Sequence, residues 1–104
     1  MAKQGRRQWN DLWAEVITAG VAVDPASMTT GTDSSTTATV TGAAVGDAVI
    51  AIPGVDMGEV SFNAYVSAAN TVEIVFYNSA AGTVDLASST WKFIVLRPEA
   101  GHFV

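Results

Sequence analysis

Few side chains in this sequence could carry catalytic chemistry. The 104 residues include a single histidine, His102, and no cysteine. His102 lies near the C-terminus, and no serine or carboxylate stands at a spacing that would pair with it in a nucleophilic triad. The absence of cysteine excludes a disulfide and a thiolate metal site. These residue types therefore give no reason to expect an enzyme.

The acidic residues form no recognisable catalytic or metal-binding pattern either. Five aspartates stand in predicted turns and loops, where such side chains commonly cap the backbone. They are Asp24, Asp33, Asp47, Asp56 and Asp85. Calcium-loop spacing is missing, and the strand glutamates Glu59 and Glu73 are not placed to face one another as a glycosidase pair does. We expect no catalytic residue, no cofactor and no metal.

Composition and charge point to an assembly or binding protein of one domain. Apolar residues make up 49% of the chain and charged residues only 14%, against about a quarter in ordinary globular domains. Residues 1–7 carry three cations, whereas residues 8–104 carry ten acids against two cations. An acidic body argues against nucleic acid as a partner. No apolar run is long enough to span a membrane and no signal peptide is recognisable, so we expect synthesis in a cytoplasm and no membrane partner.

Short strand-like runs separated by turn signals organise the rest of the chain. We expect strands at residues 21–23, 37–41, 48–52, 59–67, 70–78 and 90–97, with a polar loop over residues 29–37. Six or seven such strands without intervening helices predict an all-β fold, a small antiparallel β-sandwich or jelly-roll-like domain. Alternation assigns its core to Phe62, Ile74, Phe76, Trp91 and Phe93.

Two of these strands are apolar on both faces, which leaves additional apolar positions to be covered. They are Val75, Tyr77, Ile94 and Leu96. Three covers are open: the N-terminal arm, the loop at residues 79–89, or another subunit. We expect a homotrimer whose interface includes some of these four residues.

The first 20 residues form a basic, tryptophan-bearing arm ahead of a β-sandwich at residues 21–98 and a tail at residues 99–104. Apolar residues at 9, 12, 13, 16 and 17 share one helical face, which predicts about two turns of helix. The arm could dock on its own sandwich, dock on a neighbouring molecule, or stay extended without a helix. We expect it to carry attachment to a partner through Lys3, Arg6, Arg7, Trp9 and Trp13, because arginine and tryptophan are enriched at binding hot spots.

Several segments together resemble the virion proteins of tailed bacteriophages. These segments are residues 39–47, residues 65–72, Asn78 and the pair Thr90-Trp91. The resemblance covers about residues 21–97 and extends to small capsid decoration (cement) proteins and to modules of head or tail fibres. It implies a small β-sandwich, commonly trimeric, on the outside of a particle. We therefore expect a decoration protein that binds the major capsid protein on the capsid surface and stabilises the shell; the alternative is a receptor- or glycan-binding module of a fibre.

Overall fold

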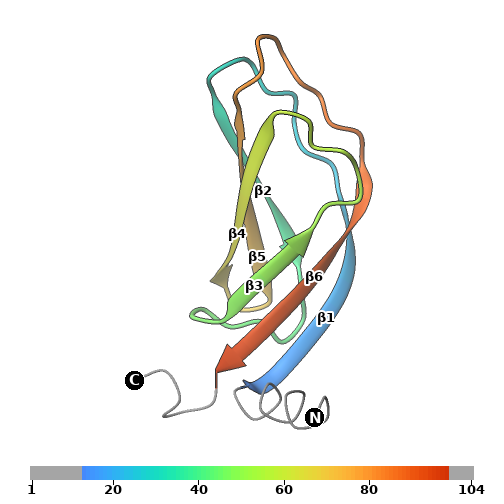
Figure 1. Cartoon of the computed structure of the whole chain (residues 1–104). Helices are drawn as coiled ribbons and strands as arrows, with labels where there is room; N and C mark the ends of the chain where they lie inside the picture. Colours follow the sequence, from blue (N-terminus) through green and yellow to red (C-terminus); the bar gives the residue numbers. More distant parts are fainter. Residues whose placement is uncertain (1–12, 99–104) are drawn as a thin grey trace, which may run out of the picture.

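The protein is an all-β sandwich of two three-stranded antiparallel sheets (Figure 1). The computed structural model describes residues 13–98, and of Trp13 and Ala14 it describes the backbone only. The strands are β1 (Trp13–Val23), β2 (Asp33–Thr39), β3 (Ala48–Ile52), β4 (Val60–Ala68), β5 (Thr71–Asn78) and β6 (Ser89–Pro98). One sheet has the order β1-β6-β3 and the other β2-β5-β4. The fold class expected from the sequence is confirmed.

The core lies between the two sheets because each strand turns one set of alternate residues inward. On the central strands β5 and β6, the buried residues include Ile74, Phe76, Trp91 and Phe93, each at most 1% exposed. The ring of Trp91 meets those of Phe62 and Phe76 edge-on, with centroids 5.1 and 5.8 Å apart. All five residues expected in the core are therefore found there, with Phe62 partly buried against it.

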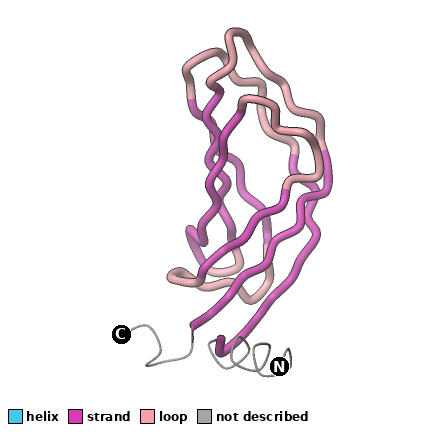
Figure 2. Tube along the Cα trace, viewed as in Figure 1, coloured by secondary structure: helices cyan, strands magenta, loops and turns pink. Residues whose placement is uncertain are grey.

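The connections gather at the two ends of the sandwich (Figure 2). The loops at residues 24–32 and 79–88 are joined by an isolated antiparallel bridge between Met28 and Val84. At the opposite end, Asn70 has a φ of 62°, and its side chain accepts a hydrogen bond of 2.8 Å from the backbone N–H of Gly42. Asparagine tolerates this left-handed conformation better than most residues, so Asn70 both closes the β4–β5 hairpin and ties it to the loop after β2.

Strand β1 corrects the prediction of a helix at the start of the chain. Residues 13–23 pair with β6 along its whole length, from Trp13 opposite Pro98 to Val23 opposite Ser89. The prediction of a helix is therefore wrong for residues 13–17, and residues 9–12 lie outside the residues that the structure describes. Alternation explains the strand, because Ile17, Ala19 and Val21 pack against the core while the residues between them face outward. Residues 13–20, assigned to the arm from the sequence, belong to β1.

Strand β2 also begins earlier than its composition suggested. The polar run from Asp33 to Thr37 was predicted as a loop, but it forms the first part of an edge strand paired with β5. Only Ala38 is fully buried in this strand, so its register depends on the ladder with β5 rather than on an apolar face. The remaining predicted strands agree with the observed ones to within about two residues.

Candidate binding faces

The outward side of the β1-β6-β3 sheet is apolar, and we call it the apolar face. Its members are the outward-pointing residues of the three strands: Val16, Thr18, Gly20, Ala22, Ala48, Ile50, Ile52, Thr90, Lys92, Ile94 and Leu96. Val16, Ile50 and Ile52 are 51%, 46% and 44% exposed. Cross-strand pairing places Ile94 between Thr18 and Ile50, so the branched side chains form one continuous patch. A patch of this kind on a sheet face is typical of an interaction surface.

The apolar face contains a shallow hollow of about 430 Å³ beside Gly20. Gly20 lies opposite Lys92 and contributes no side chain, while Ile52 and Ile94 border the hollow. The floor includes part of Phe93. A protruding apolar side chain of another molecule could therefore enter the sheet surface at this point.

The outward side of the β2-β5-β4 sheet has the opposite chemistry, and we call it the polar face. Its members are hydroxyl, amide and carboxyl residues together with two tyrosines and one valine: Asp33, Ser35, Thr37, Thr39, Ser61, Asn63, Tyr65, Thr71, Glu73, Val75 and Tyr77. Neither lysine nor arginine occurs among these residues. Tyr65 and Tyr77 are 44% and 42% exposed.

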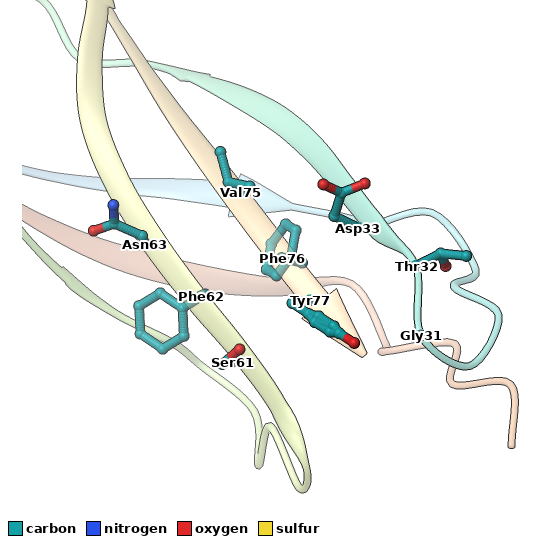
Figure 3. Close-up of a pocket in the computed structure, with 9 residues that line it drawn as sticks. All are labelled: Gly31, Thr32, Asp33, Ser61, Phe62, Asn63, Val75, Phe76 and Tyr77. Atoms are coloured by element: carbon teal, nitrogen blue, oxygen red, sulfur yellow. The ribbon is translucent and has the colours of Figure 1, made fainter. Parts of the chain in front are cut away.

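A hollow of about 590 Å³ opens at one end of the polar face (Figure 3). Its polar lining includes Asp33 from β2, Ser61 and Asn63 from β4, and Tyr77 from β5. Tyr77 is paired with both Asp33 and Ser61 across the sheet, so a carboxylate residue and a hydroxyl residue flank it on the neighbouring strands. Val75 contributes apolar surface to the same hollow and to a smaller one of about 300 Å³ next to it.

The second tyrosine of the polar face lies beside a carboxylate. Tyr65 is paired with Glu73 across β4 and β5. Loss of solvent around the hydroxyl, followed by the negative charge of Glu73, raises the pKa of Tyr65 above its usual value of 10.0. The phenol therefore stays neutral and keeps its proton for donation throughout the physiological pH range.

The one ion-pair cluster in the described residues lies at the end of the sandwich where β1 begins and β6 ends. Arg97 donates from Nε and Nη2 to the two carboxylate oxygens of Asp47, at 3.0 and 2.9 Å, and from Nη1 to Glu15 at 2.9 Å. Its Nη2 also donates to the carbonyl oxygen of Gly42 at 2.9 Å. The hydrogen bonds from Arg97 lower the pKa of Asp47, whose side chain is 5% exposed. These contacts hold the loop at residues 40–47 to β6, so the cluster stabilises the fold.

The structure separates the residues expected to form the oligomer interface. Val75 and Tyr77 are on the polar face, whereas Ile94 and Leu96 are on the apolar face. Leu96 is only 4% exposed, so Ile94 offers more surface for contact. Of the residues expected in the attachment arm, Lys3, Arg6, Arg7 and Trp9 lie outside the described residues, and Trp13 begins β1.

Of the residues on the polar face, the sequence pattern singled out Val75 and Tyr77, as interface candidates, but missed Asp33. Its strand was taken for a loop, so the alternation that would have placed Asp33 opposite Tyr77 was not applied. The contiguous apolar face was also missed as a unit. Residues 48–52 were recognised as a strand, but the pairing of β3 with β6 that brings Ile50 beside Ile94 could not be deduced from local pattern.

Within residues 13–98, no group of histidine, cysteine and acidic residues is arranged to hold a metal ion. That part of the chain also contains no helix that is long and apolar enough to cross a membrane. Fold and faces together define a small antiparallel β-sandwich with one apolar and one polar outer surface. Comparisons with protein-family models, with curated proteins and with solved structures give no match.

Proposed function

We propose that this chain is a structural protein of a bacteriophage virion, a decoration or cement protein that binds the outer surface of the capsid and stabilises it as a homotrimer. The observation that carries the proposal is the apolar face, where Val16, Ile50 and Ile52 are about half exposed around Ile94. Such a surface is costly to leave in water and is typical of a subunit contact. The resemblance of residues 39–47 and 65–72 to virion proteins is the reason for proposing a virus particle as the partner.

A trimer suits this role because one copy binds weakly through a small area, whereas three linked copies bind together. When a trimer sits on a threefold position of a shell, each further contact is intramolecular, so modest single-site affinity becomes high avidity. In this proposal the apolar face is covered by the neighbouring copy, and the basic segment at residues 1–12 contacts the major capsid protein. Carboxylates on the shell would pair with Arg6 and Arg7, and apolar pockets would receive Trp9.

Light scattering combined with size exclusion tests the subunit contact. The wild-type chain should be a trimer at micromolar concentration, and Ile50→Glu combined with Ile94→Glu should give a folded monomer, because both charges would be buried at the contact. The matched control is Thr37→Glu on the polar face, which should leave the trimer intact. A monomeric wild-type chain would overturn the trimer.

Deletion of residues 1–12 tests attachment without removing any part of β1. The deletion variant should keep the melting temperature of the full chain and lose binding to undecorated particles of the virus that encodes it. Retained binding would reject the attachment role, and a large fall in melting temperature would show that the segment covers its own sandwich instead. Arg6→Ala with Arg7→Ala is the finer variant, and it should weaken binding in a salt-dependent way.

The alternative, a receptor- or glycan-binding module of a fibre, is favoured by one specific observation, the exposed tyrosines of the polar face. The two functions differ in whether the chain coats the particle. A decoration protein binds purified undecorated particles, whereas a fibre module leaves such particles uncoated.

A further inference from the structure

We propose that the polar face binds a neutral oligosaccharide, with Tyr77 packing against one sugar ring in the 590 Å³ hollow and with Asp33 and Asn63 hydrogen-bonded to its hydroxyl groups. This goes beyond capsid attachment, because the polar face belongs to the sheet on the other side of the sandwich from the apolar face. A copy held through the apolar face leaves the polar face free.

The hydrogen-bonding groups of this face select the chemical class of the ligand. Asp33 and Glu73 can only accept hydrogen bonds, while Asn63 and Ser61 both donate and accept. A ligand rich in hydroxyl groups satisfies all of them, since each hydroxyl is a donor and an acceptor. An apolar ligand would leave these groups without partners, which costs binding free energy.

The charge of the face excludes anionic ligands. It carries two carboxylates and, among the described residues, neither lysine nor arginine. A phosphorylated, sulfated or sialylated ligand would bring negative charge next to Asp33 or Glu73 with no cation to offset it. A ligand without negative charge is therefore favoured, which agrees with the neutral hydroxyl groups that the hydrogen-bonding residues select.

The tyrosines supply the apolar contact that a sugar needs. A tyrosine ring offers a large rigid surface with a polar end, at a small cost in conformational entropy. Tyr77 is 42% exposed and lines the hollow beside Val75, so its ring has apolar surface available next to hydrogen-bonding groups. This combination of apolar surface and a few placed polar groups is typical of small-molecule sites.

The distance between the two tyrosines indicates the size of the ligand. Tyr77 of β5 is paired with Ser61 of β4, and Tyr65 is four positions after Ser61 on β4. At about 3.3 Å per residue, the backbone positions of the two tyrosines are roughly 13 Å apart along the strand direction. This separation exceeds a single sugar ring, so the face fits a chain of several sugars that runs along the strand, past Asn63.

Nuclear magnetic resonance titration of the full chain tests the proposal directly. The probes are maltotriose, cellotriose and chitotriose as neutral ligands, and sialylated lactose beside lactose as a charged comparison. At least one neutral trisaccharide should shift the amide signals of residues 33–35, 61–65 and 73–77, and sialylation should weaken binding. The absence of shifts with every neutral probe, or shifts confined to the apolar face, would overturn the proposal.

Three variants of the site separate recognition from folding. Tyr77→Ala should weaken binding by about tenfold, which corresponds to the loss of one aromatic contact, whereas Tyr77→Phe should retain most of the affinity. Asn63→Ala removes hydrogen bonds without removing ring contact and should also weaken binding. Val45→Ser, in the exposed loop after β2 and on neither face, is the matched control and should bind like the wild type. Equal affinity of wild type and Tyr77→Ala would refute the assigned site.

Discussion

Replacing the buried Asn78 with alanine should destabilise the fold more than any other asparagine substitution on a strand. Asn78 is 0% exposed. Its Nδ2 donates to the carbonyl oxygens of Met28 and Gly82 at 2.9 and 3.0 Å, and its Oδ1 accepts from the N–H of Ala80 at 2.9 Å. One side chain therefore holds the loops at residues 24–32 and 79–88 to the end of β5.

The magnitude follows from those three hydrogen bonds. Each contributes about 1 kcal/mol net, so Asn78→Ala should lower the free energy of unfolding by about 3 kcal/mol. For a domain of this size, that loss corresponds to a fall in melting temperature of roughly 12 to 24 °C. The matched control is Asn63→Ala on the exposed polar face, which should change stability by about 0.5 kcal/mol or less. Chemical denaturation followed by tryptophan fluorescence measures both.

Asn78→Asp gives a second, pH-dependent readout of the same contacts. A carboxylate there would face two carbonyl oxygens without solvent, so its pKa in the folded state should rise above the unfolded value of about 3.9. The folded state then binds more protons than the unfolded state at intermediate pH, and the variant gains stability relative to the wild type as pH falls towards that value. The reasoning is refuted if Asn78→Ala and Asn63→Ala melt alike, or if the deficit of Asn78→Asp does not depend on pH.

Three further predictions concern the core, the ion pair and one close backbone approach. Phe76→Ala should cost about 3 to 5 kcal/mol in thermal or chemical unfolding, whereas Thr32→Ala in the exposed loop should cost about 0.5 kcal/mol or less. Asp47→Ala should lower the free energy of unfolding by about 1 to 3 kcal/mol, a range that allows for the partly exposed arginine. Because folding lowers the pKa of Asp47, the stability difference between this variant and the wild type should be constant at neutral pH and should narrow as pH falls below the ordinary pKa of 3.8. Gly54→Ala should destabilise the fold strongly, because the added methyl group would overlap a carbonyl oxygen of β6. Gly82→Ala should leave stability unchanged, because its methyl group would meet no atom within 4 Å. Equal melting temperatures for the two glycine variants would contradict this packing.

The strands at the centre of the sandwich could be predicted from sequence because their patterns are strong. Alternation placed Phe62, Phe76 and Trp91 inside, and the turn signals around residues 68–70 and at Pro98 bounded β4, β5 and β6 to within about two residues. These strands lie where burial is nearly complete, so side-chain pattern and structure agree.

The edge strands could not be predicted as well, since long-range pairing decides them. Val16 and Ile17 fit a helical stripe and an alternating strand equally, and the ladder between β1 and β6 selects the strand. The first part of β2, from Asp33 to Thr36, has the composition of a loop, and only its ladder with β5 makes it a strand. The apolar and polar faces depend on the same pairings, so neither could be assembled from local sequence alone.

The pairing of Trp13 with Pro98 has a practical consequence for building on this protein. The chain enters β1 and leaves β6 at one end of the sandwich, while the loop at residues 79–88 lies at the other (Figure 1). Fluorescent domains fused before residue 1 and after residue 104 of the full chain, with residues 1–12 and 99–104 kept, would thus both be tethered to the same end. If that end lies against a shell, as the proposed attachment through residues 1–12 requires, both fusions should prevent coating; if both coat the particle and are displayed, that end points away and the attachment role of residues 1–12 is rejected. A single pair of fusion proteins would therefore report which way up the sandwich stands on whatever it coats.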